Sequence, residues 1–344
     1  MSEDPVTSTR ATIRDIARFA GVSVATVSRV INDRPDVSDE TRDAVARVVR
    51  AHNFSTNRSA RALSVGRTGL IGLTIPFVLG GYFTAILSGA TEALHEAEMR
   101  AVLCPTLHLH DREVALVERL MRGTTDGAIL VLPSESAEEL RELQLQGFPF
   151  VIVDSEQPLA DDLPVVSAGH LAGARAATDH LLDLGHRRIA IITGQSGWFA
   201  TEERIKGYHG ALATAGVFPA PELMVSGNFE ITGGEAAAHT LLALAEPPTA
   251  IFASNDNMAV GALRGARERG LRVPEDLSIV GFDDADISRI VSPALTTVRQ
   301  PLEEMGRMAV SLLTRLLEKQ RVETLGIELA TRLVVRDSTA PPPS

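Results

Sequence analysis

The sequence predicts a small all-α helix-turn-helix head followed by an α/β body of two Rossmann-like lobes, each built on a parallel sheet. The first observation is charge: eleven arginines and six acidic residues stand between positions 10 and 67, although the chain's net charge is −11. The second is that short apolar runs alternate with helical patterns from residue 70 onward, in two successive sets. The charge indicates a polyanion-binding module, and the alternation is typical of parallel sheets covered by helices on both faces.

Length and composition are those of a globular protein with two or three domains. The chain has 344 residues, of which 22% are charged and 44% hydrophobic. Its one cysteine, Cys104, cannot form an intrachain disulfide, which suits a reducing compartment. Because no apolar region follows the N-terminus and no run of eighteen apolar residues occurs, we expect neither a signal peptide nor a membrane span. The expected location is the cytoplasm, on the nucleoid.

Three short helices are predicted in the head (residues 12–56), after a disordered tail over residues 1–11. Thr12 and Asp15 form a capping-box pattern at the first helix, and Gly21 suits a left-handed turn after it. Ser23 is placed to cap the second helix and Ser38 the third. Short helices with a glycine turn between the first two are typical of a helix-turn-helix.

The second helix, within "GVSVATVSRVIN" (residues 21–32), is built from small and hydroxyl-bearing residues and one arginine. A helix in the major groove needs a narrow apolar stripe toward its own domain and small side chains toward the bases. Hydroxyl groups can donate to phosphates, and arginine can pair with both acceptors of guanine. The pattern therefore favours a DNA-recognition helix; the alternative is a helical hairpin packed inside a larger domain.

The effector and dimerisation body is predicted over residues 68–337, with a tail over 338–344. Strands are expected at 70–75, 101–104, 127–132 and 150–153, and then, starting a second set at "VVSA" (165–168), at 188–194, 223–227, 249–255 and 277–283. The predicted N-lobe covers about 68–163 plus 297–325, and the C-lobe about 164–296 plus 326–337. In such sheets, ligands bind beyond the carboxyl ends of the strands. Polar and aromatic side chains follow those ends, which favours a small polyhydroxylated ligand.

Patterns for catalysis, cofactors or metals are weak. "GHRR" (185–188) precedes a strand, whereas a phosphate-binding glycine loop follows one. The two adjacent acids of "GFDD" (281–284) have no further clustered ligands, and no nucleophile elbow is visible. We therefore predict no enzyme activity, no cofactor and no metal site.

The stretch "TIRDIARFAGVSVATVSRVIN" (12–32) with "VSDETRDAV" (37–45) resembles the DNA-binding head of the lactose-repressor (LacI/GalR) family of bacterial regulators. The resemblance implies that Val24, Ala25 and Arg29 face base edges. It places Ser23, Thr26, Ser28 and Asn32 at backbone phosphates, although the hydroxyl of Ser28 could instead pack between helices.

Residues 57–63, "NRSARAL", resemble the family's hinge helix, within a hinge and linker over 57–67. The resemblance implies DNA contacts at Asn57, Ala60, Arg61 and Leu63. Leu63 would wedge into the minor groove, unless it is an ordinary linker residue. So short a helix would form only on DNA with a partner hinge. Thr56 stands where the family usually has proline, so we expect hinge folding to cost more.

In the body, "RIKGY", "ASNDNMAVGAL", "VPEDLSIVGFDD", "SPALTTVRQP" and "LVVRDS" resemble family motifs, and the two-lobed architecture is similar to periplasmic binding proteins. The resemblance implies main polar ligand contacts from Arg204, Asn255 and Asp283. It implies a cleft lined by Asp154, Tyr82, Phe83, Trp198 and Phe229. Alternative roles remain open. Arg204 could serve only as a structural ion-pair partner of Asp283, Trp198 could pack between the lobes, and Phe229 could belong to the hydrophobic core. His170 replaces a family asparagine, and its contact with the pocket is an open alternative.

The function implied is a ligand-responsive transcription factor, most often a repressor in this family. It would bind a pseudo-palindromic double-stranded operator as a homodimer and respond to a sugar-like effector, either an inducer or a corepressor. A dimer rather than a tetramer is expected because the C-terminus has no heptad repeat. The alternative is a plain small-molecule binder like a periplasmic receptor, which would need a signal peptide and no head.

Overall fold

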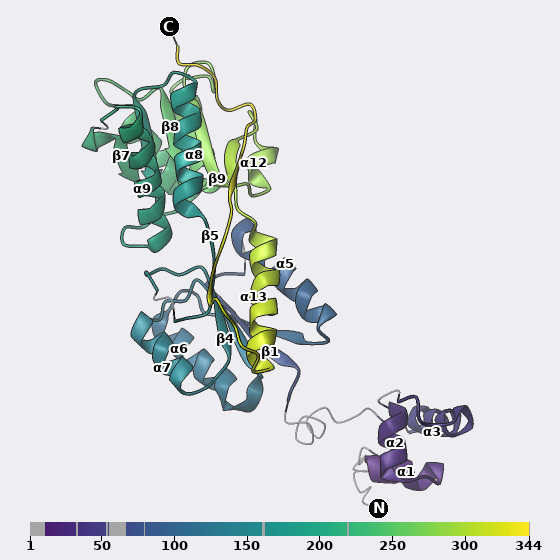
Figure 1. Cartoon of the computed structure of the whole chain (residues 1–344). Coiled ribbons are helices and arrows are strands. Elements are labelled where there is room, and N and C mark those ends of the chain that lie inside the picture. Colours follow the sequence, from purple (N-terminus) through teal and green to yellow (C-terminus); the bar gives the residue numbers. More distant parts are fainter. Residues whose placement is uncertain are drawn as a thin grey trace, which may run out of the picture. The chain divides into compact units, whose positions relative to one another are not determined.

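The structure is a computed structural model that describes residues 11–31, 34–52, 54, 67–78, 80–159, 162–218 and 220–343. The chain divides into two compact units, Met1–Thr68 and Gly69–Ser344 (Figure 1). Within the described residues, no helix is both long and apolar enough to cross a membrane. The first unit contains the predicted head, and the second contains the predicted body.

The head consists of α1 (Ile13–Ala20), α2 (Val24–Ile31) and α3 (Asp39–Ala51), as predicted. The capping box of Thr12 and Asp15 is present, and Gly21 ends α1 with a φ of 67°. The Ser23 hydroxyl accepts from the Thr26 amide at 3.0 Å, which confirms it as the cap of α2. A small core joins the three helices through Ile16, Ala17, Val27 and Val45. The predicted DNA contacts Asn32, Asn57, Ala60, Arg61 and Leu63 lie outside the described residues.

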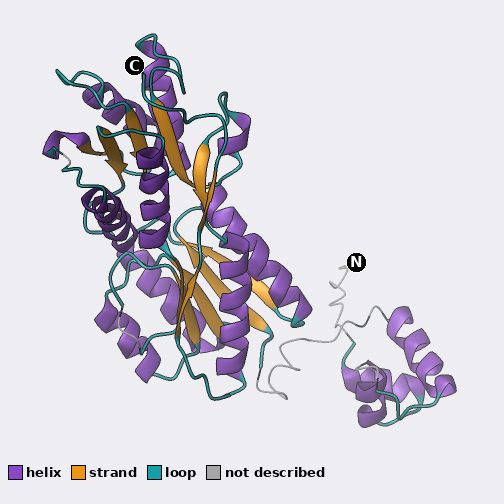
Figure 2. Cartoon of the chain, turned by 45° about the horizontal axis from the view of Figure 1, so that its top comes forward, coloured by secondary structure: helices purple, strands orange, loops and turns teal. Residues whose placement is uncertain are grey.

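The first lobe is a parallel sheet with helices on both faces (Figures 1 and 2). Its strand order is β11-β5-β4-β3-β1-β2. One face packs on α5 and α13, which lie side by side, and the other packs on α6 and α7. The elements are β1 (Leu70–Ile75), α5 (Gly81–Glu96), β2 (Arg100–Pro105), α6 (His110–Arg119), a π-helical turn (Leu120–Thr124), β3 (Gly127–Val131), α7 (Ala137–Leu145), β4 (Phe150–Val153), β5 (Val165–Ala168), α13 (Leu302–Leu317) and β11 (Gly326–Leu329).

The second lobe repeats this architecture, with strand order β12-β10-β9-β8-β6-β7 and one antiparallel pair, β10 with β12. Alternate residues of β6 face opposite ways: Ile189 and Ile191 pack toward α8 and α9, and Ile192 packs toward α10 and α11. The elements are α8 (His170–Asp183), β6 (Ile189–Thr193), α9 (Phe199–Thr214), a 3₁₀ turn (Pro221–Leu223), β7 (Met224–Ser226), α10 (Ile231–Leu241), β8 (Ala250–Ala253), α11 (Asp256–Glu268), β9 (Ser278–Asp283), α12 (Ile287–Ile290), β10 (Thr296–Arg299) and β12 (Arg332–Val334).

The chain crosses between the lobes one strand away from each predicted boundary. The run "VVSA", predicted to open the second set, is β5 and pairs with β4 in the first sheet. β11, predicted in the second lobe, pairs with β5, and β10, predicted in the first, pairs with β9. The predicted lobe boundaries are therefore wrong at these three strands. Apolar periodicity identifies a buried strand but not the sheet in which it pairs, so the pattern could not locate the crossings.

The prediction of a tail over 338–344 is wrong for its first residues, which pack on the second lobe. Ser338 is fully buried. Its hydroxyl accepts from the Thr296 amide at 2.8 Å and donates to the Ile279 carbonyl at 2.5 Å. The Ile279 amide in turn donates to the Ser338 carbonyl at 2.8 Å. Figure 1 shows the chain after β11, in yellow, running from the first lobe along the second toward the C-terminus.

Replacing Ser338 with alanine should lower the free energy of unfolding by about 1–3 kcal/mol, because a buried amide and a buried carbonyl lose their shared partner. Chemical denaturation of the purified protein measures this change. Pro343→Ala, at the exposed end of the same segment, is the control and should leave the midpoint unchanged. Equal stability of the two variants would mean that the segment does not hold the lobe.

Candidate functional site

The carboxyl ends of the strands in both sheets bring the predicted ligand residues of the body into one connected group. Tyr82 and Asp154 come from the first lobe, and Arg204 and Asp283 come from the second. His170, the first residue of α8, stands where the chain crosses from one lobe to the other. The side chains of His170, Asp154 and Arg204 are 2–5% exposed, and that of Asp283 is 11% exposed.

Arg204 is the centre of this group. Its guanidinium donates to the Ser254 carbonyl and lies 4.0 Å from the centroid of the Phe282 ring. Its Nη2 is 4.0 Å from Asp283 Oδ1 and 3.3 Å from His170 Nδ1. The 4.0 Å separation is an ion pair without a hydrogen bond, so Asp283 compensates the charge of Arg204 but does not occupy its donors.

Asp154 joins the first lobe to the second. The Tyr82 hydroxyl donates to one of its carboxylate oxygens, and His170 Nε2 lies 3.4 Å from the other. A polar chain therefore runs from Tyr82 through Asp154 and His170 to Arg204. The His170 imidazole lies inside the polar group, between a carboxylate and a guanidinium, and its contact with a ligand stays a prediction.

The pKa values in this group reflect competition between burial and neighbouring charges. Burial raises the pKa of Asp283 to about 6, although Arg204 and Gln300 oppose the change. Burial also acts to raise the pKa of Asp154, but His170, the Tyr82 hydroxyl and Arg204 outweigh it, so that pKa lies below its ordinary value. The two carboxyl groups therefore differ: Asp154 keeps its charge easily, and Asp283 gains a proton easily.

Aromatic rings form the other part of the site. The Trp198 ring lies 5.6 Å from Phe229 and 5.4 Å from His108 of the first lobe, measured between centroids. Trp198 thus contacts both lobes while remaining partly exposed. Phe229 covers Gly194, where a Cβ atom would come within 1.9 Å of the ring. Phe83 packs edge-on against Tyr82 at 5.1 Å.

Three of the predicted ligand residues adopt left-handed backbone conformations. The φ angles are 52° for Asp154, 62° for Phe229 and 114° for Asp283. Non-glycine residues rarely adopt such angles, and the cost persists where the surrounding structure imposes it, as it commonly does at binding sites. Strained backbone conformations therefore occur at three of the positions that carry the predicted ligand residues.

Asn255 has a structural role in addition to its predicted one. Its Oδ1 accepts from the Met258 amide at 2.9 Å, which caps α11, and its Nδ2 donates to the Phe229 carbonyl at 3.0 Å. The amide group thus fixes the position of Phe229 beside Trp198. Both polar atoms are engaged by backbone groups.

Several buried polar atoms near Arg204 have no hydrogen-bond partner within the described residues. They are Arg204 Nε, Asp154 Oδ1, Ser254 Oγ and Thr201 Oγ1. An unpaired polar atom of this kind costs about 1–3 kcal/mol, so a partner from outside the chain would be favourable. The group holds both donors and acceptors, which matches a ligand that carries hydroxyl groups.

Two residues of the site were not predicted from the sequence. Gln300 donates to Asp283 Oδ1 at 2.7 Å, and His108 lies 3.3 Å from Glu156, with its ring tilted by 51° against that of Trp198. Each follows the carboxyl end of a strand, β10 and β2 respectively, so the same inspection of strand ends could have found them. A cavity of about 500 Å³ reaches Asp283 and Gln300 and is bordered by the first residues of α5 and α13.

In the head, α2 buries one side against its own domain and exposes the other. Val27 is fully buried, whereas Val24, Ala25 and Arg29 are exposed. Arg29 Nε lies 3.4 Å from Asp36 Oδ2, with both side chains more than half exposed. Such a surface ion pair contributes about 0–1 kcal/mol, so Arg29 can exchange it for another acceptor.

A helix-turn-helix head, together with a two-lobed body that holds a buried polar group beside aromatic rings, is the architecture of a ligand-responsive transcription regulator. Two family models match the chain: bacterial regulatory proteins of the lacI family over residues 12–57, and a periplasmic binding protein-like domain over residues 178–339. The ribose operon repressor of Halalkalibacterium halodurans is 34% identical over 328 residues, which are 95% of this chain and 97% of the relative. The chain belongs to the LacI family of transcription regulators.

Solved structures agree with this assignment. A complex of the transcriptional regulator CelR with cellobiose is 33% identical, with a TM-score of 0.72. The Lac repressor dimer bound to operator and the anti-inducer ONPF is 28% identical, with a TM-score of 0.87. Both matches cover 96% of this chain and 100% of the other. The predicted fold class and family are therefore confirmed.

Asp283→Asn should stabilise the ligand-free protein at about pH 8 by roughly 1–3 kcal/mol, because the desolvation cost of the ionised Asp283 carboxyl exceeds the attraction of Arg204, and a neutral amide of similar size removes that net cost. The folded-state pKa of about 6 exceeds the ordinary value of 3.8. Between these two pH values the folded protein therefore binds a proton at Asp283 that the unfolded chain does not bind. The loss of stability caused by the ionised Asp283 carboxyl in the wild type is present above pH 6 and disappears as the pH falls toward 4.

The advantage of this variant should therefore shrink between about pH 8 and pH 4.5 in thermal unfolding experiments. Asp286→Asn, at an exposed position near the same strand end, is the control and should follow the wild type at every pH. A stability difference for Asp283→Asn that does not depend on pH would contradict the raised pKa.

Proposed function

We propose that this protein is a repressor that binds a pseudo-palindromic operator as a homodimer and that a sugar or related polyol in the interlobe cleft controls its affinity for DNA. The observation that carries the proposal is the polar group around Arg204, with its buried unpaired donors and acceptors next to aromatic rings. The relatives support the ligand class, since one is named a ribose operon repressor and one neighbour is a complex with cellobiose.

The head supports DNA binding through the chemistry of α2. Its exposed face offers Val24, Ala25 and Arg29 to base edges. Thr26 and Ser23 stand at the N-terminal end of the helix, where amide and hydroxyl donors suit a phosphate. Ser28 extends this set of proposed phosphate contacts, as does Asn32 beyond the described residues.

The cleft supports recognition of a small polyhydroxylated molecule. The paired charges of Arg204 and Asp283 offer donors and an acceptor for adjacent hydroxyl groups, and Asp154 Oδ1, which faces His170 Nε2 at 3.4 Å, offers an acceptor on the opposite lobe. The apolar face of a sugar ring would lie against Trp198 and Phe229. Tyr82, Phe83 and Asn255 complete the proposed lining.

Regulation follows from the distribution of these contacts over two lobes. A ligand held by Asp154 on one side and by Arg204 and Asp283 on the other changes the relative stability of the lobe arrangements. The three chain crossings, after β5, β10 and β11, are where the lobes can rotate. A change in the spacing of the two hinge segments of a dimer would alter operator affinity by a coupling free energy of about 1–3 kcal/mol.

Arg29→Ala should weaken operator binding by roughly 1–3 kcal/mol and relax the preference at one base pair per half-site, because the guanidinium supplies two donors to one guanine. Fluorescence anisotropy with a set of operator variants measures both effects. Arg50→Ala removes the same charge from the exposed end of α3 and is the matched control. A uniform loss across all sequences for Arg29→Ala would place this arginine on a phosphate instead.

Asp283→Ala should abolish the effector response while leaving operator affinity within about twofold of wild type, because ligand hydroxyl groups lose their acceptor and the head is untouched. Asp276→Ala, which removes an acid bonded to Arg272 outside the cleft, should respond normally. Calorimetry on folded Asp283→Ala protein, with an effector found by screening sugars, polyols and nucleosides, is decisive. Wild-type effector affinity would refute the pocket assignment.

A further inference from the structure

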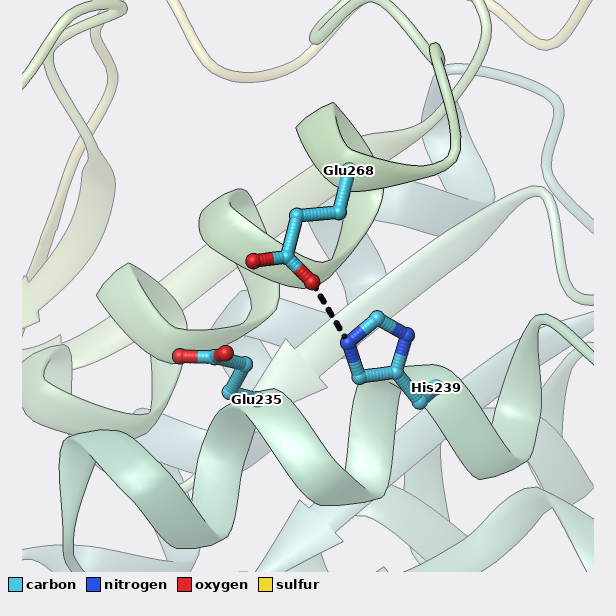
Figure 3. A group of neighbouring side chains, drawn as sticks. All are labelled: Glu235, His239 and Glu268. Atoms are coloured by element: carbon cyan, nitrogen blue, oxygen red, sulfur yellow. Dashed lines mark hydrogen bonds and ion pairs between the residues drawn. The ribbon is translucent and has the colours of Figure 1, made fainter.

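A second group of polar side chains lies away from the cleft, on the paired helices α10 and α11 of the second lobe. Glu235 and His239 are four residues apart on α10, so they share one face of that helix. Glu268 is the last residue of α11. Figure 3 shows the two carboxylates and the imidazole gathered between the helices. One donor atom from each lies within 4.8 Å of the other two.

We propose that Glu235, His239 and Glu268 form a binding site for a divalent first-row transition metal ion, with Zn²⁺ the best fit. Imidazole nitrogen and carboxylate oxygen are both ligands of Zn²⁺, and three protein ligands leave positions for water. Tetrahedral bonds of about 2.0–2.2 Å place neighbouring donors about 3.3–3.6 Å apart. The separation of His239 Nε2 and Glu268 Oε2 is 3.0 Å, so these two atoms need to move apart by only a few tenths of an ångström.

The helices that carry the three ligands are held rigidly together. Glycines let the two backbones approach closely: a Cβ atom on Gly234 would lie 2.3 Å from the Met258 carbonyl, and one on Gly261 would lie 2.1 Å from that of Ile231. Arg269, next to Glu268, donates to the His239 and Leu242 carbonyls at 2.9 Å each. The donor atoms therefore need only small side-chain rotations, which reduces the entropy lost on binding.

The charge of the site also favours a cation. Two carboxylates face one imidazole, and Glu235 has no hydrogen-bond or ion-pair partner among the described residues. A surface ion pair between His239 and Glu268 alone would not require Glu235. The second carboxylate, that of Glu235, is thus the feature that distinguishes a metal site from an ordinary ion pair.

A metal here would act on helices that frame the cleft. α10 begins two residues after Phe229, and α11 begins directly after Asn255. The Asn255 side chain already joins the N-terminal ends of the two helices, because it donates to the Phe229 carbonyl. A metal bound nearer their C-terminal ends would join the helices there as well. The metal site does not depend on the proposed operator or sugar function.

Isothermal titration of Zn²⁺ into the tag-free full-length protein, in a buffer that does not chelate metals, should give one site per chain. His239→Ala and Glu235→Gln should each weaken binding at least about tenfold, since each removes one ligand. Glu235→Gln is the sharper variant because it leaves the contact between His239 and Glu268 intact. Zn²⁺ should raise the melting temperature of the wild type but not of these variants.

His110→Ala is the matched control. His110 contacts Glu139 at 3.1 Å in the first lobe, but there no third donor from the described residues completes a group. This variant should bind Zn²⁺ like the wild type. Wild-type affinity in folded Glu235→Gln, verified by circular dichroism, would overturn the proposal, as would loss of binding in His110→Ala. Co²⁺ absorption bands that survive in His239→Ala would overturn it as well.

Discussion

One buried guanidinium organises the body of this protein. Moving the charge of Arg204 out of water costs several kcal/mol unless opposite charge and hydrogen bonds compensate it. The compensation comes from elements far apart in sequence: the Ser254 carbonyl, the Asp283 carboxylate, the His170 imidazole and the Phe282 ring. Burial lowers the pKa of Arg204 in spite of these partners, so its compensation is incomplete. The side chains of the group are therefore arranged around a buried charge that they compensate only in part.

The same compensation connects the two lobes. His170 begins α8 immediately after the chain leaves the first sheet, and its ring lies between Asp154 of one lobe and Arg204 of the other. A rotation of the lobes therefore cannot occur without changing the environment of a buried charge. In packed interiors such changes proceed between discrete arrangements rather than continuously. The crossing at His170 thus gives the fold a physical reason to behave as a two-state element.

Local features of the fold were predictable from the sequence, and long-range ones were not. The caps at Ser23 and Ser38 and the turn at Gly21 depend on neighbours within a few residues, and periodicity located nearly every strand. The sheet membership of β5, β10 and β11 depends on pairing, which no local pattern encodes. For the same reason, the sequence pattern predicted a tail at Ser338. Its buried position depends on contacts with Thr296 and Ile279, which are distant in sequence. In the polar group, family motifs at the strand ends predicted Arg204 and Asp283 as neighbours, and they lie 4.0 Å apart, whereas the contact of His170 with both lobes required the crossing to be located first.

The net charge is positive over residues 10–67 and negative over residues 68–344, and this difference bears on regulation. The residues from 68 to 344 carry 22 basic and 36 acidic side chains, so the body repels the DNA backbone. Sequence-independent attraction to DNA, which comes from neutralised phosphates, is thereby confined to the small head. If two heads must bind neighbouring half-sites, affinity depends steeply on their spacing, because the bodies add no attraction of their own. A modest shift between lobes can then change occupancy of the operator, whereas a basic body would hold the protein on DNA whatever the state of the cleft.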